Sequence, residues 1–148
     1  MFFKKILKYL LFLLPWGVSS IFAMNNYSYY NSLNLPFFAP PSIVFPIVWT
    51  ILYLLIAYSI YKVFPVSDKY YKKVLLINYI ANQLFTFLFF GLKNTFLAFV
   101  DTVLVFVSSL YLYEATYNID KKAAKLLIPY IIWSLFALVL SLTITVMN

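Results

Sequence analysis

Residues 42–61, SIVFPIVWTILYLLIAYSIY, form a run of twenty residues without a charged side chain. A helix needs about 20 mainly apolar residues to cross a bilayer. Four more mainly apolar runs lie at residues 6–24, 74–92, 96–115 and 126–147. The chain of 148 residues is 65% hydrophobic and 10% charged, whereas soluble domains are nearer half apolar and a quarter charged. The sequence therefore predicts an all-α membrane protein in which residues 1–148 form one domain, a bundle of five transmembrane helices.

The charges predict how the chain lies in the membrane. A net charge of +7 on a soluble protein would suggest nucleic acid as a partner. Here the lysines lie between apolar runs, so we interpret them as topology signals and expect no nucleic-acid partner. Only Lys93 lies on one side of the predicted bundle, and ten lysines lie on the other: Lys4, Lys5, Lys8, Lys62, Lys69, Lys72, Lys73, Lys121, Lys122 and Lys125. Because cytoplasmic loops are rich in lysine, the N-terminus is expected in the cytoplasm and the C-terminus outside.

The first apolar run has a second interpretation. Its start, MFFKKILKYLLFLL, resembles a signal peptide, and small residues follow at Ser19, Ser20 and Ala23. However, the run extends well past 15 residues, and Ile21 fits poorly at position −3 for cleavage after Ala23. We favour an uncleaved transmembrane helix.

The loop at residues 25–41, NNYSYYNSLNLPFFAPP, carries no charge and is rich in aromatic residues and turn formers. It is either an aromatic belt at the membrane interface or a lid over a pocket. Pro40 and Pro41 favour an extended backbone before the next helix, and Pro46 lies near its first turn. These prolines are expected to fix how the second helix begins beneath the loop.

Three helical stripes carry the aromatic and polar residues. The second run has Pro46, Trp49, Tyr53 and Ala57; the third has Asn78, Asn82 and Thr86, with Phe85 beside them; the fifth has Pro129, Trp133, Ala137 and Ser141. Steps of three or four residues place each set on one helix face. The stripes either converge on a ligand chamber with aromatic walls or mediate ordinary helix packing, with the amides bonding between helices. The sequence leaves both interpretations open.

Asp101, the acid within the fourth run, and the absence of three residue types limit the reactions and metal sites that the chain can support. An intramembrane carboxylate such as Asp101 is a functional candidate, but we favour a structural role as a helix cap, with Lys93 as an available partner. The sequence has no His, Cys or Arg, so it offers no disulfide, usual zinc site or His- or Cys-ligated haem.

Several motifs together resemble the tryptophan-rich sensory protein, or translocator protein (TspO), family. They are SLNLPFFAPPSIVF with IVWTILY (residues 32–45 and 47–53), NYIANQLF (78–85), LFFGLKNTFLAFVD (88–101) and LLIPYIIWSLFA (126–137). The resemblance covers essentially the whole chain. It implies a five-helix bundle in the bacterial cytoplasmic membrane, often a homodimer among membrane lipids, with a cavity beneath the first long loop. Gly91, Ala98, Ser108 and Ser109 are candidates for close helix contacts in such a dimer.

The resemblance also implies ligands and site residues. Family members bind tetrapyrroles, notably protoporphyrin IX, and isoquinoline-type ligands, with no obligatory cofactor. Trp49 and Trp133 match the two cavity tryptophans linked to porphyrin photochemistry, which makes them the candidate catalytic residues. The other cavity positions are matched by Ser20, Tyr30, Tyr53, Asn82, Phe85 and Ala137.

The chain departs from the family pattern at several positions. Tyr29 and Phe38 replace loop tryptophans, Phe85 replaces a tryptophan, and Ser141 replaces an asparagine. Whether the loop changes preserve porphyrin affinity is open. The C-terminal TVMN lacks the Tyr and Arg of the proposed cholesterol motif, so cholesterol transport is not expected.

We therefore expect a membrane receptor or sensor that binds tetrapyrroles in an aromatic cavity. The alternatives are an enzyme that degrades porphyrin with light and oxygen, and a transporter of porphyrin or lipid-like molecules. Transport ranks lower because the sequence shows no inverted repeat. A membrane scaffold with an incidental pocket also stays open.

Overall fold

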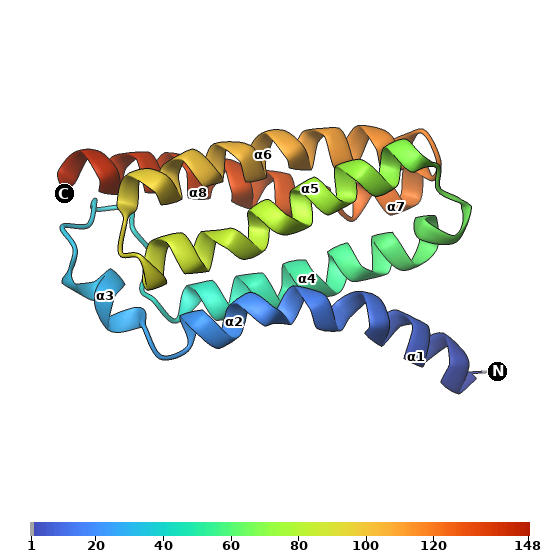
Figure 1. Cartoon of the computed structure of the whole chain (residues 1–148), viewed down its shortest axis with the longest axis horizontal. Coiled ribbons are helices and arrows are strands. Elements are labelled where there is room, and N and C mark those ends of the chain that lie inside the picture. The colour runs from blue at the N-terminus through green and yellow to red at the C-terminus, as the bar shows by residue number, and fades with distance from the viewer. Residues whose placement is uncertain (1) are drawn as a thin grey trace.

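The computed structural model describes residues 2–148, and this part of the chain is helical without a β-strand. Five stretches are long and apolar enough to cross a membrane: Phe2–Ala23, Val44–Val66, Lys69–Gly91, Thr95–Tyr117 and Lys121–Met147. They run side by side in one bundle (Figure 1). The predicted fold class, an all-α bundle of five membrane-spanning helices, is confirmed.

The first stretch is divided at a proline. It consists of α1 (Phe2–Leu13), a 3₁₀ helix, η1 (Leu14–Gly17), and α2 (Val18–Ala23). Pro15 has no N–H to donate, and its ring clashes with the carbonyl four residues earlier, so a regular α-helix cannot pass through it. The Tyr79 hydroxyl donates a hydrogen bond to the Pro15 carbonyl at 2.8 Å, which fixes the break against a neighbouring helix.

The other elements follow in order: α3 (Tyr27–Ser32), α4 (Val44–Val63), η2 (Phe64–Val66), α5 (Lys69–Thr86), η3 (Phe87–Gly91), α6 (Thr95–Tyr117), α7 (Lys121–Lys125) and α8 (Ile128–Met147). Two helices begin before their apolar runs because an aspartate caps them. Asp68 accepts from the Tyr71 N–H at 2.8 Å, and Asp120 accepts from Lys122 and Ala123 N–H groups at 2.8 and 3.0 Å. A side-chain acceptor at this position satisfies N–H groups that lack a partner within the helix.

Helix α6 lies at the centre of the packing, in contact with α5 and α8. Ala98, Ser108 and Ser109, which we considered for a dimer contact, are buried inside this single chain. Small residues let neighbouring helices approach closely, and here they serve the chain's own bundle. Only Gly91 of that group remains exposed.

Helix α1 packs least deeply. None of its residues is buried, and its main neighbour is α4. The Tyr9 hydroxyl donates to the Leu54 carbonyl at 3.0 Å, and the Tyr9 ring meets the Tyr58 ring at 6.2 Å. Towards the N-terminus α1 slopes away from the other helices (Figure 1).

A layer of hydrogen-bonded polar side chains crosses the middle of the bundle. The Tyr130 hydroxyl donates to Asn78 Oδ1 at 3.0 Å, and Asn82 Nδ2 donates to the Tyr130 oxygen at 3.2 Å. Asn78 Nδ2 donates to Ser108 Oγ at 2.8 Å, and the Tyr53 hydroxyl donates to Asn82 Oδ1 at 3.0 Å. The amides therefore join helices, one of the two roles that the stripes suggested, and α4, α5, α6 and α8 all take part.

The structure corrects our interpretation of Asp101. The cap of α6 is Asn94, whose side chain accepts from the Leu97 N–H at 2.9 Å. Asp101 is 2% exposed and its two carboxylate oxygens have no hydrogen-bond partner. The ammonium of Lys93 lies instead over the Tyr29 ring, 5.7 Å from its centroid. Asp101 is thus neither a cap nor bonded to Lys93.

The two ends of the bundle differ in charge. The ten lysines flank the N-terminus and the α4–α5 and α6–α7 connections, which lie at one end (Figure 1). Lys93 lies at the other end, with α3 and the C-terminus. The orientation relative to the cytoplasm stays a prediction.

Candidate ligand-binding cavity

A cavity of about 310 Å³ lies in the half of the bundle that carries α3. Its walls come from α2, α3, α4, α5, η3, α6 and α8. All eight residues predicted to bind ligand line it: Ser20, Tyr30, Trp49, Tyr53, Asn82, Phe85, Trp133 and Ala137. The three helical stripes therefore do meet around one space.

Aromatic rings form most of the wall. Trp49 tilts against Tyr53 with ring centroids 5.3 Å apart, and Trp133 meets Phe45 at 6.2 Å. The indoles come from α4 and α8, so two flat, electron-rich surfaces line the same cavity from different helices. Aromatic faces of this kind bind other flat rings by offset or edge contacts.

The end of η3 contributes two rings that sequence reasoning missed. Phe89 and Phe90 both line the cavity, and Phe85 stacks on Phe89 at 5.5 Å with an interplanar angle of 11°. Residues Phe87–Gly91 form a turn of π-helix, which carries an extra residue and changes the direction of the following side chains. Phe89 lies four residues after Phe85 and Phe90 lies four residues after Thr86, so extending the α5 stripe by one turn would have found both rings.

Other residues missed by the sequence include Tyr27, Phe45 and Thr102, which also line the cavity. Phe45 lies four residues before Trp49, so extending the α4 stripe by one turn would have found it. Thr102 adjoins Asp101, but nothing in the sequence separates it from other small residues of α6.

The polar groups of the cavity are mostly bonded to one another. Ser19 Oγ and the Tyr53 hydroxyl lie 3.2 Å apart, Tyr53 donates to Asn82, and Gln83 Nε2 donates to Asn82 Oδ1 at 3.2 Å. These bonds leave few free polar groups for a ligand and fix the base of the cavity as part of the polar layer.

One donor in the cavity wall is unpaired. Nε1 of Trp133 is buried and has no hydrogen-bond partner among residues 2–148. A buried polar group without a partner costs free energy. Within residues 2–148 the cavity wall carries no charged side chain, so it suits a neutral, apolar ligand body.

Residues 25–41, which we term the lid, cover this end of the bundle. The Tyr30 side chain is 3% exposed, and its hydroxyl donates to the Pro40 carbonyl at 2.8 Å. Burial raises the pKa of the Tyr30 hydroxyl above its ordinary value, so this donor keeps its proton. The Tyr29 hydroxyl donates to the Lys93 carbonyl at 3.0 Å, which joins the lid to the α5–α6 turn.

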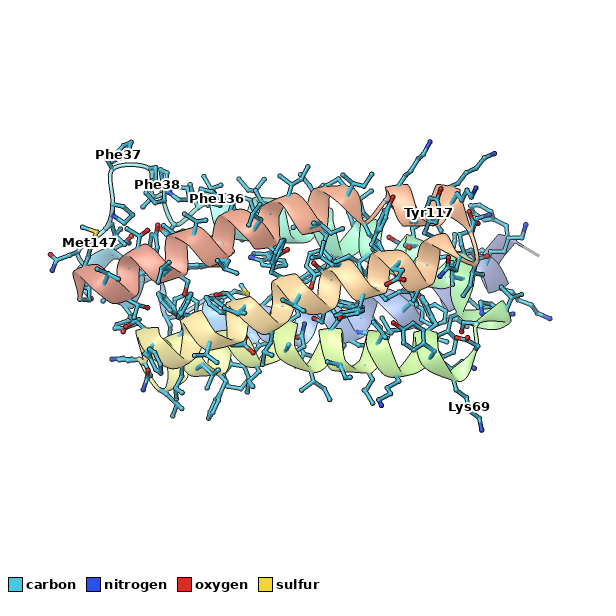
Figure 2. All side chains as sticks on the ribbon, turned by 90° about the horizontal axis from the view of Figure 1, so that it is seen from above. Phe37, Phe38, Lys69, Tyr117, Phe136 and Met147 are labelled. Carbon is cyan, nitrogen blue, oxygen red and sulfur yellow. The ribbon has the colours of Figure 1, made fainter. Side chains whose placement is uncertain are left out.

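The lid is also joined to the last turn of α8. The Asn34 N–H donates to Asn148 Oδ1 at 2.9 Å, and Asn148 Nδ2 donates to the Asn34 carbonyl at 3.0 Å. Phe38 packs on Phe136 at 6.4 Å, whereas Phe37 is fully exposed and points away from the bundle (Figure 2). The loop is therefore mainly a lid, with Phe37 alone placed as expected for an interfacial belt.

Comparisons with known proteins agree with these features. The TspO/MBR family pattern matches residues 9–147. The tryptophan-rich protein TspO of Bacillus cereus is 39% identical, and the similarity covers 100% of both chains. The tryptophan-rich sensory protein of Cereibacter sphaeroides is 34% identical over 72% of this chain and 68% of its own. The tryptophan-rich protein TspO of Archaeoglobus fulgidus is 32% identical over 82% of this chain and 80% of its own.

Proposed function

The chain belongs to the TspO/MBR family of multi-pass integral membrane proteins, and on that premise we propose that it is a receptor that binds tetrapyrroles such as protoporphyrin IX beneath the lid. The observation that carries the proposal is the cavity itself, lined by Trp49 and Trp133 and by no charged side chain. The confirmed family membership supports the ligand class, since the resemblance implies tetrapyrrole binding.

The cavity's composition supports a flat, metal-free macrocycle. Indole rings on α4 and α8 offer faces for its pyrrole rings. The chain has no His or Cys to ligate a haem iron. With about 310 Å³, the cavity lies at the lower end of the range for ligand pockets. We therefore expect the macrocycle to enter edge first, with its charged propionates left at the lid.

The test is a titration of purified protein with protoporphyrin IX in the dark, in which tryptophan fluorescence measures binding. Wild-type protein should show saturable quenching. Trp133→Phe should bind more weakly, because phenylalanine offers a smaller aromatic face than the indole. Trp16→Phe is the matched control, since Trp16 does not line this cavity. Absence of saturable quenching in the wild type, or equal weakening in both variants, would contradict the proposal.

A second candidate function is light-dependent oxidation of the bound porphyrin by molecular oxygen. The observation that favours it is the placement of two indoles in the wall of one cavity. The excited porphyrin would supply the reactivity, and the protein would hold it beside electron-rich rings. Under illumination in air, wild-type protein should lose the porphyrin absorption band. Trp49→Phe should bind porphyrin but keep the band; equal bleaching without protein would exclude catalysis.

We also propose that the protein is a homodimer, as the family resemblance implies. The bundle presents extensive apolar surface on every long helix, so detergent or lipid must be present in the measurement. Light scattering coupled to size-exclusion chromatography should give twice the mass of one 17.4 kDa chain after correction for detergent. A monomer mass at all concentrations would contradict this.

A further inference from the structure

A second space lies in the other half of the bundle, at the end that carries the N-terminus. It is a groove of about 350 Å³ between α1, α4 and α5, lined by Leu11, Phe12, Pro15, Trp16, Ile60, Phe64, Lys72, Leu75, Leu76 and Tyr79. We call it the lysine groove. It shares no lining residue with the cavity beneath the lid.

The break at Pro15 creates this groove. Near the break, α1 is held against α5, because the Trp16 ring meets the Tyr79 ring at 5.2 Å and Tyr79 donates to the Pro15 carbonyl. Beyond the break, α1 slopes away towards the N-terminus (Figure 1). Trp16 and Tyr79 therefore close one end of the groove, and Phe12 packs on Phe64 at 5.2 Å towards the end that carries Lys72.

The groove opens towards hydrocarbon rather than towards another helix. Leu11 and Leu76 at its edges are 62% and 57% exposed, while Trp16 and Ile60 at its base are buried. Lys72 and Tyr79 are seven residues apart on α5, which is about 10 Å along the helix. One leaflet of hydrocarbon is about 15 Å deep. The groove thus suits part of an acyl chain and is too short for a further transmembrane helix.

One end of the groove is cationic. Lys72 places its ammonium 5.2 Å from the centroid of the Phe64 ring, at the groove wall. Lys8 lies one turn before Leu11 and Phe12 on α1 and so shares their helix face. This end of the bundle carries ten lysines against three acids, Asp68, Glu114 and Asp120. An anionic head group is attracted to such a position, whereas a zwitterionic one would bring a second cation among the lysines.

We propose that the lysine groove binds one anionic glycerophospholipid of the surrounding membrane, with an acyl chain along Leu75 and Trp16 and the phosphate at Lys72. A free phosphate would meet a mostly apolar wall and a single ammonium, so the lipid is the better occupant. The site makes this face of the protein sensitive to the lipid composition of the leaflet, independently of any ligand beneath the lid.

Trp16 provides a local reporter for the test. In the Trp49→Phe/Trp133→Phe double variant, Trp16 is the one remaining tryptophan of the sequence. We would titrate this protein in neutral detergent with phosphatidylglycerol that carries brominated acyl chains, which quench a tryptophan on contact. Saturable quenching is expected, and phosphatidylcholine with the same chains should require a higher concentration for half-saturation.

Substitutions then locate the head group and the chain. Adding Lys72→Gln should raise the half-saturating concentration of phosphatidylglycerol about fivefold. The matched control, Lys73→Gln, is exposed and outside the groove and should leave the concentration unchanged. Leu75→Phe, which fills the middle of the groove, should reduce quenching by both lipids.

Three results would overturn the proposal. Equal quenching by both lipids would remove the role of the anionic head group. Equal losses in Lys72→Gln and Lys73→Gln would indicate a general attraction to basic surface. Tighter quenching by a brominated fatty acid than by phosphatidylglycerol would assign the groove to single-chain anions.

Discussion

The bundle has two halves that place small residues differently, separated by the polar layer of Asn78, Asn82 and Tyr130. In the half near the N-terminus, small residues bring helices together: Ser59 Oγ donates to the Ala123 carbonyl at 3.0 Å, and Ala57 is fully buried. In the half beneath the lid, small residues such as Ala137 line an open cavity. The difference lies in what faces them: Ala57 lies in the buried interior, whereas Ala137 lies beside the space lined by Trp49 and Trp133. A small residue in a membrane helix therefore does not by itself predict close packing.

The largest expected effect comes from breaking the layer between the halves. Asn82→Leu removes the acceptor of Tyr53 and Gln83 and the donor to Tyr130. Each lost bond within a membrane protein costs roughly 0.6 kcal/mol, and buried groups left unpaired cost more. We expect a loss of about 2 kcal/mol, measured as a lower midpoint of thermal unfolding in detergent. Asn118→Ala, at an exposed position, is the control; equal midpoints for the two variants would show that the layer contributes little.

A matched pair of substitutions compares the halves directly. Ala57→Leu overpacks the fully buried interior of the half near the N-terminus and should destabilise the protein by about 1–2 kcal/mol. Ala137→Leu adds the same atoms to the cavity wall and should leave the unfolding midpoint nearly unchanged, while weakening porphyrin binding by about tenfold. Both quantities should be measured on both variants. A large loss of stability in Ala137→Leu would mean that the lid half is as tightly packed as the other.

The lid can be loosened without altering the cavity wall's shape. Tyr30→Phe removes only the hydroxyl that donates to Pro40, which is worth about 1 kcal/mol. We expect faster release of porphyrin in stopped-flow measurements, with a fewfold higher dissociation constant. Tyr111→Phe, an exposed tyrosine on α6, should release ligand at the wild-type rate. An unchanged release rate in Tyr30→Phe would show that this bond does not hold the lid.

The smallest effect is expected at Asp101, the buried acid that the polar layer does not include. Its oxygens have no partner, and a buried ionisable group in a membrane helix is costly. Asp101→Asn keeps the shape and removes the ionisable group, so the free energy of unfolding should rise slightly, by under about 1 kcal/mol. A clear fall in the unfolding midpoint would show that the carboxyl group has a partner beyond this single chain.

The sequence predicted the number of long helices because the thickness of the bilayer sets their length and composition. It did not predict where α5 begins, since the turn at Lys69 is polar and the Asp68 cap lies outside the apolar run. Nor did apolar run length reveal the break at Pro15, which depends on one missing N–H rather than on average hydrophobicity.

The residues of the candidate site were predicted in part, as the helix boundaries were. Regular steps along α4, α5 and α8 identified Trp49, Asn82 and Trp133, because residues four apart share a helix face. Phe89 and Phe90 were missed because the α5 stripe was not extended one turn past Phe85 and Thr86, although both follow at steps of four residues. The cap assigned to Asp101 was wrong because Asn94, a residue type that favours the N-cap position, caps α6 before Thr95, close to the predicted start of the run at residue 96.

The paired bonds between Asn34 and Asn148 have a consequence for how opening of the lid can be observed. Since the lid is bonded to the last turn of α8, any excursion that lifts it also frees that turn to fray. The rate of amide hydrogen exchange at residues 144–148, which lie outside the lid, would then depend on how often the lid opens. A ligand that holds the lid shut should slow this exchange, so the end of α8 would report occupancy of the cavity through protection factors.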